Sequence, residues 1–129
     1  MEVIRTERGW AGHFICSNRC QFRRNTLLEC ENIKIVVSTV GLVTGFKDKS
    51  KYAKIGMDHY YETKAFHAQE QDGYYDIDVS QEIYFDSNCQ INDIYVESDL
   101  DANDMHEIVV AEITKKLENG EQFEVEVLD

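Results

Sequence analysis

Carboxylates and tyrosines alternate with apolar side chains in several short segments of the second half of the chain. The pattern occurs at residues 74–79 (YYDIDV), 82–86 (EIYFD), 91–97 (INDIYVE) and 123–128 (FEVEVL). A period of two residues is typical of a β-strand with one buried face, because successive side chains of a strand point to opposite sides. If the apolar sets of these strands share one core, their carboxylates gather on a single opposite face.

Such an acidic face is suited to binding a basic partner. Residues two apart on a strand stand about 6.6 Å apart, and neighbouring strands lie about 4.8 Å apart, so the face resembles the dense charge of a nucleic-acid backbone. Tyrosines among the acids can stack on arginine guanidinium groups. The residues predicted to contact the partner are Asp76, Asp78, Glu82, Asp86, Asp93, Glu97, Tyr74, Tyr84 and Tyr95. The alternative is that the acids only aid solubility and that the tyrosines are ordinary strand residues.

Charge is distributed very unevenly along the chain. The 129 residues include 13 Lys and Arg against 25 Asp and Glu, which gives a formal net charge of −12. Residues 1–64 carry 11 of the basic and 7 of the acidic side chains, a net of +4, whereas residues 65–129 carry 2 and 18, a net of −16. Because phosphate contacts require Lys and Arg, direct nucleic-acid binding by the acidic half is disfavoured. A protein partner with a positively charged surface is favoured instead.

Four residues of the first half have the side chains of a zinc site. His13, Cys16, Cys20 and Cys30 are spaced H-x2-C-x3-C-x9-C, which lacks the second paired element of a structural zinc site. Reduced thiols are the favoured interpretation, because a chain of this size can stabilise itself with a core and nothing in the sequence indicates export. The zinc site stays open as an alternative.

Motifs of known catalytic chemistry do not occur in the sequence. It has no P-loop, no G-x-G-x-x-G and no G-x-S-x-G. Asp99 and Asp101 begin like a calcium loop, but Asp104 replaces the required glycine and Val110 the final glutamate. The sequence therefore predicts a non-catalytic protein without a cofactor, and a small metal-dependent or cysteine enzyme is the alternative.

A sheet and one helix must position the acidic face. Residues 33–40 (IKIVVSTV) are the most β-branched stretch and predict a central strand, while residues 2–6, 10–15 and 59–67 are further candidate strands. A helix is predicted over residues 102–118, with Asp101 as its N-cap and Asn119-Gly120 as its C-terminal stop. The apolar stripe predicted to cover the sheet is Met105, Ile108, Val109, Ile113 and Leu117.

These elements predict a single α+β domain over residues 1–129, with a mainly antiparallel β-sheet and one long C-terminal helix packed on one face. The longest uncharged run, residues 35–46, has 12 residues, against about 20 for a membrane-spanning helix. No secretory signal is visible at the N-terminus. We therefore expect a cytoplasmic protein without a membrane partner, and a homodimer remains open.

Three stretches of the first half, RTERGWAGHFIC (residues 5–16), FRRNTLLEC (22–30) and IVVSTVG (35–41), resemble uncharacterised small proteins of phages, prophages and plasmids. The resemblance implies a bacterial host and a mobile genetic element. Such elements often encode small acidic inhibitors of host defence, including anti-CRISPR and anti-restriction proteins. Together with the acidic face, it predicts a nucleic-acid mimic that occupies the basic surface of a host nuclease or defence complex. A structural or assembly protein of a mobile element is a further alternative.

Overall fold

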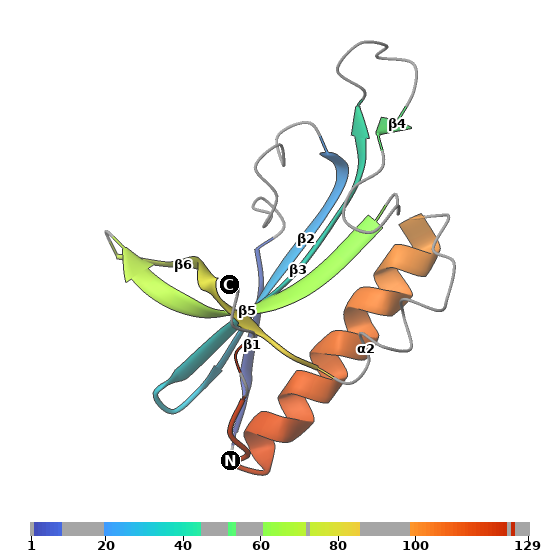
Figure 1. The fold of residues 1–129 in the computed structure, drawn as a ribbon. Helices are drawn as coiled ribbons and strands as arrows, with labels where there is room; N and C mark the ends of the chain where they lie inside the picture. Colours follow the sequence, from blue (N-terminus) through green and yellow to red (C-terminus); the bar gives the residue numbers. More distant parts are fainter. Residues whose placement is uncertain are drawn as a thin grey trace.

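The computed structural model describes residues 2–8, 20–44, 52–53, 61–71, 73–85, 99–123 and 125. Within them, one antiparallel sheet follows the strand order β1-β2-β3-β5-β6, β4 pairs with the end of β3, and one helix packs against the sheet (Figure 1). The predicted α+β fold is thus confirmed. The elements are β1 (Ile4–Glu7), β2 (Cys20–Cys30), β3 (Ile33–Thr44), β4 (Tyr52–Ala53), β5 (Tyr61–Gln71), β6 (Tyr74–Ile83) and α2 (Asp99–Glu118).

β3 is the central strand, as its β-branched sequence predicts, and it pairs with both β2 and β5. Its side chains are buried on both sides of the sheet: Ile35 and Val37 on one, Val36 and Val40 on the other. Strands buried on both faces have nearly continuous apolar sequences rather than alternating ones, and residues 33–40 fit that description. We call the side of Ile35 and Val37, which α2 covers, the helix face, and the other side the opposite face.

The main core lies between the helix face and α2, which crosses the sheet diagonally in Figure 1. Burying apolar side chains between one helix and one sheet is the usual way for such layers to become stable. Partly buried Val3 and Phe123 close the margins of this core. Its buried members are Leu28, Cys30, Ile35, Val37, Ala65, Ile83, Phe85, Val109, Val110, Ile113 and Leu117.

α2 begins three residues before the predicted start, so Asp101 lies inside the helix and is not its N-cap. The predicted C-terminal stop is confirmed. Gly120 has a φ of 68°, and the amide of Glu121 donates to the carbonyl of Lys116 over 3.0 Å. A left-handed glycine with this bond closes the last helical turn, because it satisfies a carbonyl that the helix leaves unpaired.

Four of the five residues of the predicted stripe of α2 are buried, and the exception is Ile108. Ile108 is 49% exposed, whereas His106 is fully buried and takes part in the contact with the sheet. The stripe therefore runs through Ala102, Met105 and His106 to Val109 and beyond. Apolarity alone misplaces the face here, because the helix buries a histidine that has hydrogen-bond partners on the sheet.

The other predicted strands fall into three groups. Residues 2–6 and 59–67 correspond to β1 and β5, with boundaries shifted by one to four residues, and residues 74–79 and the start of 82–86 lie in β6. From residues 123–128, Val125 forms an antiparallel bridge with Ile83. The strands predicted at residues 10–15 and 91–97 lie outside the described residues. No helix in the described part of the chain combines the length and apolarity needed to cross a membrane.

Candidate functional site

The predicted acidic face is described in part. The structure places the side chains of Asp76, Asp78, Glu82 and Tyr84, and the backbone of Tyr74, on β6 or directly after it. The remaining predicted contact residues lie outside the described residues: Asp86, Asp93, Glu97 and Tyr95.

β6 does not keep one alternation along its length, because its pairing with β5 contains an irregularity. Ile77 lies opposite Ala68 and Glu82 lies opposite Phe66, so four residues of β6, 78–81, face a single residue of β5. Residues opposite each other in an antiparallel pair point to the same side of the sheet. Three additional residues on one strand therefore invert which positions face the helix.

The inversion separates the predicted acids. Asp76 lies opposite Gln69, a helix-face position beyond the end of the core, whereas Glu82 lies opposite Phe66 on the opposite face. The prediction that the described carboxylates of β6 share one face is therefore wrong. The cause is local, since an uninterrupted period of two would have placed both on one side.

The opposite face is also not an open carboxylate lattice. Val36, Ser38 and Val40 are fully buried there, and Phe66 is 3% exposed. Arg8, which follows β1, contributes to this closure. Its Nε donates to Oδ1 of Asn25 over 2.8 Å, and its Nη1 donates to the carbonyl of Tyr75 on β6.

Arg8 therefore links the two ends of the strand order, because its side chain reaches from the β1 side of the sheet to β6. A single arginine can span that distance only if the sheet is strongly curled, as twisted sheets are. Burial lowers the pKa of Arg8, and the negative charge of Asp76 opposes that shift.

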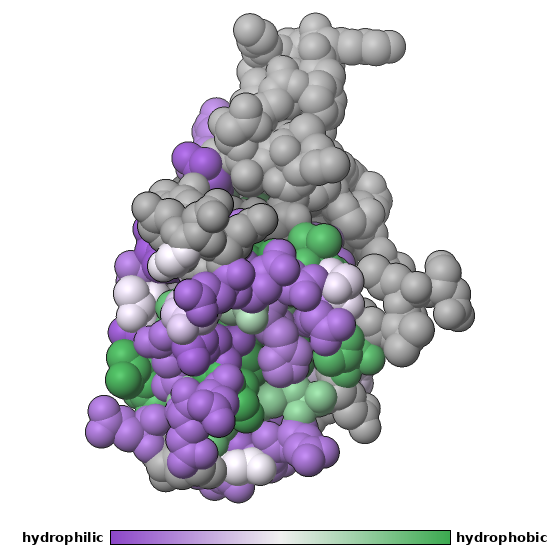
Figure 2. All heavy atoms as spheres, turned by 90° about the vertical axis from the view of Figure 1, so that its left-hand side faces the viewer, coloured by the Kyte–Doolittle hydropathy of each residue, from purple (hydrophilic) through white to green (hydrophobic). Residues whose placement is uncertain are grey.

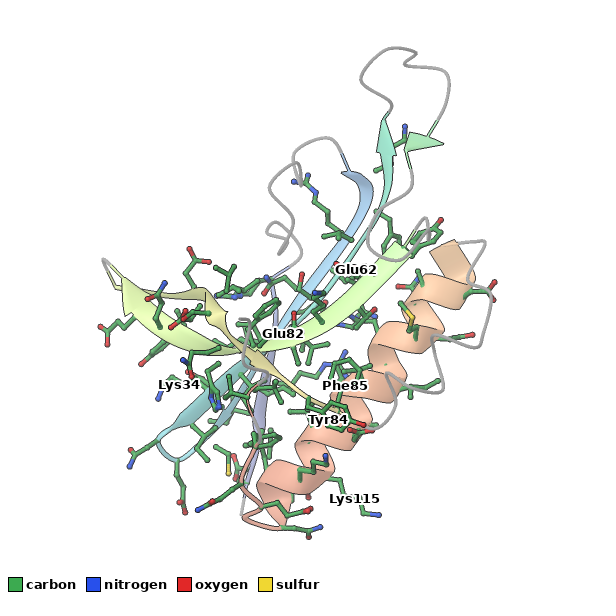
Figure 3. The ribbon with its side chains drawn as sticks, in the orientation of Figure 1. Lys34, Glu62, Glu82, Tyr84, Phe85 and Lys115 are labelled. Atoms are coloured by element: carbon green, nitrogen blue, oxygen red, sulfur yellow. The ribbon has the colours of Figure 1, made fainter. Side chains whose placement is uncertain are left out.

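Glu82 is neutralised within the protein. Lys64 Nζ lies 2.8 Å from Glu82 Oε1, and the Glu82 side chain is only 13% exposed. Figure 3 shows Glu82 on β6, followed by Tyr84 and Phe85 at the end of the strand. Phe85 is buried in the core, whereas Tyr84 is 40% exposed. Of these residues, Tyr84 has the most exposed side chain.

Asp78 and Asp76 shape the irregular part of β6. Oδ1 of Asp78 accepts hydrogen bonds from the amide and the hydroxyl of Ser80, at 3.0 and 2.6 Å. Oδ1 of Asp76 accepts from the amide of Ile77. Asp and Ser side chains that bind nearby amides favour turns over regular strands, so these residues help to create the irregularity.

Three exposed carboxylates lie at the end of the sheet formed by the β2–β3 turn and the β5–β6 turn. Glu31 lies in the first turn, and Glu70 and Asp76 flank the second. None of the three makes an ion pair with the described residues. We call these three residues the acidic end. Both turns project to the left in Figure 1, and the coloured part of the surface seen from that side is mostly hydrophilic with several hydrophobic areas (Figure 2).

An aromatic ring lies beside the acidic end. Tyr75 pairs with Glu70, and the ammonium of Lys34 lies 5.0 Å from the centre of the Tyr75 ring. This is the geometry of a cation–π contact. In a strand of period two that turns Asp76 away from the helix, Tyr75 would face the helix, but its register places it on the opposite face. The Tyr75 ring thus already binds a cation of the protein itself.

A buried chain of hydrogen bonds under α2 is the feature that the sequence did not predict. Nε2 of His106 lies 2.7 Å from Oγ1 of Thr26, and Nδ1 lies 2.8 Å from Oγ1 of Thr39. Thr26 donates to Glu7 over 2.9 Å, and Thr39 lies 2.7 Å from the Thr63 hydroxyl.

The directions of these bonds fix the tautomer of His106. Because the only hydroxyl proton of Thr26 goes to Glu7, Nε2 of His106 carries a proton and donates to Thr26. Nδ1 then accepts from Thr39, which in turn accepts from Thr63. Burial, with the positive charge of Arg24 nearby, lowers the pKa of His106 to about 4. The imidazole is therefore neutral at pH 7.

The outer end of this chain is a group of four charged side chains. Arg5 donates to both carboxylate oxygens of Glu107 over 2.7 and 2.9 Å, and Arg24 lies 2.9 Å from Glu7 and 3.3 Å from Glu107. The hydrogen bonds from Arg5 hold the pKa of Glu107 at about 2. Burial raises the pKa of Glu7, but hydrogen bonds from Arg24 and Thr26 outweigh it and leave the pKa below its usual value.

Both ring nitrogens of His106 are engaged, and the ring is fully buried. These hydrogen bonds can therefore join α2 to the sheet, but the buried imidazole of His106 cannot contact a substrate. A signal for it was present in the sequence, since His106 lies one helical turn after Ala102 and before Val109 and Val110. That spacing places it on the buried stripe.

Only part of the possible zinc site lies within the residues that the structure describes. No group of three or more His, Cys, Asp or Glu side chains is arranged there to hold a metal ion. Cys30 has a free, buried thiol that contacts the carbonyl of Leu117 over 3.8 Å. His13, Cys16 and the side chain of Cys20, the other members of the possible zinc site, lie outside the described residues.

Comparison of the chain with protein-family models, with curated proteins and with solved structures finds no match.

Proposed function

We propose that this protein is a non-catalytic acidic inhibitor that binds the positively charged, nucleic-acid-binding surface of another protein. The proposal rests on one observation: the carboxylates of the acidic end are exposed and make no ion pair with the described residues, in a chain with a net charge of −12. A surface of one sign is costly for a folded protein because like charges repel. Its retention is explained if a basic partner neutralises it.

The distribution of basic side chains supports this interpretation. Arg5 and Arg24 bind Glu107, Lys64 binds Glu82, and Arg8 is held by Asn25 and the backbone of Tyr75. Arg5, Arg24 and Lys64 thus neutralise acids of the sheet and of α2. Glu31 and Glu70 make no ion pair with the described residues, and Asp76, whose charge interacts with that of Arg8, makes none either.

The chemistry of the contact would be that of arginine and lysine binding carboxylates. Such hydrogen bonds are charge-assisted, and those of arginine are often bidentate. Long-range attraction between opposite charges would also accelerate association at low salt. Tyr75 and Tyr84 would add aromatic contacts beside the acids. The sequence resemblance to small proteins of phages and plasmids makes a defence nuclease of a bacterial host the partner class we propose.

Charge reversal at the acidic end tests the proposal. The variant Glu70→Lys/Asp76→Lys and the matched control Asp104→Lys/Glu118→Lys change the net charge equally, and all four residues are exposed. Each immobilised protein is incubated with bacterial lysate at low and at high salt, and captured proteins are identified by mass spectrometry. We expect wild type and control to capture a nucleic-acid-binding protein that added duplex DNA or salt displaces, and we expect the first variant to lose it.

Two outcomes would contradict the proposal. Equal capture by the Glu70/Asp76 variant would exclude the acidic end as the contact surface. A captured protein that DNA does not displace would exclude competition for a nucleic-acid-binding surface. Far-UV circular dichroism of all variants checks that the fold is unchanged.

A further inference from the structure

β1 is the first strand in the order of the sheet, and its outer edge is accessible. All four residues, Ile4–Glu7, are exposed. Among the described residues, β2 is the strand that pairs with β1. An exposed edge presents backbone amides and carbonyls that can pair with a strand from another molecule.

The hydrogen-bond pattern shows which backbone groups point outward. The amide of Arg8 donates to the carbonyl of Asn25 on β2 over 2.7 Å. In an antiparallel pair, such bonded positions alternate with positions whose amide and carbonyl point away. Arg8, Thr6 and Ile4 therefore direct their backbone groups toward β2, and Arg5 and Glu7 direct theirs to the outer edge.

The sequence of β1 is self-complementary in one register. If two copies pair antiparallel around Thr6, Arg5 of each lies opposite Glu7 of the other, and Thr6 lies opposite its own copy. The outward amides and carbonyls of Arg5 and Glu7 then meet in bonded pairs, and opposite charges face each other. Shifting the register by one bonded pair places Arg5 against Arg5 or Glu7 against Glu7, where like charges repel.

We propose that a second copy of this chain docks on β1, so that the two sheets form one continuous antiparallel sheet across a twofold axis. The axis passes between the two Thr6 residues and is perpendicular to the joined sheet. Such an axis does not exchange the two faces of the sheet, so both helices lie on the same side. The charges that favour this register are Arg5 and Glu7, which are 40% and 42% exposed in the single chain and would add the contact across the axis to their pairs with Glu107 and Arg24. This inference does not depend on the proposed function.

A cysteine at the axis tests the register. Residues opposite each other at a non-bonded antiparallel position have Cα atoms about 4.5 Å apart, a distance that a disulfide can bridge. We expect Thr6→Cys to form a disulfide-linked dimer on mild oxidation, with the cross-link between the two substituted positions identified by peptide mass spectrometry. The matched control is Ile4→Cys, whose two copies are offset by four residues along the pair, about 13 Å. Wild type controls for the native cysteines.

Failure of Thr6→Cys to form this disulfide, or equal linkage of Ile4→Cys, would overturn the proposal. A second experiment tests the backbone pairing without a thiol. Arg5→Pro removes an outward amide and leaves the bonds to β2 in place, and Arg5→Ala removes the same side chain but keeps the amide. In sedimentation at about 0.15 M salt, where repulsion between the acidic chains is screened, we expect wild type to dimerise as its concentration rises.

The two variants should then differ. Arg5→Ala should weaken the dimer because the pairing with Glu7 is lost, and Arg5→Pro should abolish it. A wild type that stays monomeric at millimolar concentration would overturn the proposal, and so would an Arg5→Pro protein that dimerises as well as Arg5→Ala.

Discussion

The buried histidine should make the stability of this protein fall as the pH is lowered. His106 is fully buried, and its pKa in the folded protein is about 4 against an ordinary value of 6.5. The unfolded chain therefore binds a proton at pH values where the folded protein does not. By linkage, this group stabilises the fold fully above pH 6.5, and its contribution is lost progressively as the pH falls toward 4.

The size of the effect follows from the two pKa values. A difference of one pKa unit between two states is worth about 1.4 kcal/mol, so a pKa of about 4 against 6.5 corresponds to about 3 kcal/mol. That is a large part of the total stability of about 5–15 kcal/mol of an ordinary domain. Protonation would also require Nδ1 to donate, which reverses the hydrogen bonds of Thr39 and Thr63.

Urea unfolding of wild type and His106→Gln, measured by far-UV circular dichroism from pH 4 to 8, isolates this contribution. The glutamine variant is less stable at pH 7 because it cannot bind Thr26 and Thr39 in the same geometry, but it lacks the titrating group. Glu7 and Glu107 also lose stabilising contacts at low pH, and they do so in both proteins. We expect the free energy of unfolding of wild type to fall by about 3 kcal/mol more than that of the variant between pH 7 and 4.

His67→Gln is the matched control, because the pKa of the half-buried His67 is also lowered by burial, with Asp78 opposing the shift. Since His67 is less buried than His106, its removal should change the pH dependence less. Parallel stability curves for wild type and His106→Gln would refute the reasoning. They would mean that His106 titrates near its ordinary pKa and that the hydrogen-bonded chain is not closed to water.

Four substitutions test the packing and the helix end. Gly41→Ala should destabilise the fold, since a Cβ there would lie 2.2 Å from Cδ1 of Tyr61; overpacking of this kind costs about 1–3 kcal/mol, and an unchanged melting temperature would contradict the contact. Ile113→Ala in the core should cost about 2–5 kcal/mol in urea unfolding, and Ile108→Ala on the exposed side less than about 0.5 kcal/mol; equal costs would mean that the helix is rotated from the position described. Gly120→Ala should cost about 1 kcal/mol because of the positive φ, and thermal unfolding that shows no loss would argue against the left-handed helix end.

Those elements with a strong local pattern could be predicted from the sequence. The β-branched run at residues 33–40 indicates a strand, and the apolar spacing before Gly120 indicates a helix and its end. Each pattern arises from residues that are close in the sequence, so it does not depend on tertiary contacts. The rotation of α2 about its own axis could not be predicted as well. Ile108 and His106 lie close together on the helix, and which of them is buried depends on the side chains of the sheet. The hydroxyls of Thr26, Thr39 and Thr63 make the histidine the buried one.

The acidic face could not be predicted correctly, because strand alternation indicates a face only while the register is continuous. Residues 74–79 and 82–86 each alternate, but the four residues 78–81 opposite one residue of β5 invert the second segment relative to the first. Asp78 and Ser80 form the local bonds that favour this irregularity. The available signal is the turn-forming Asp78-x-Ser80 between the two alternating segments, which a period of two does not take into account.

The unequal charge of the two halves has a structural consequence that sequence counts do not reveal. The positive first half is not a separate surface, because Arg5 and Arg24 reach Glu107 on α2 and Lys64 reaches Glu82 on β6. Neutralisation is thus concentrated where the two halves pack, and excess negative charge remains at the turns that extend beyond the core. A partner would then meet carboxylates on projecting turns rather than on a flat face. Under the proposed function, the contact surface is therefore formed by these turns, where the residues chosen for charge reversal, Glu70 and Asp76, lie.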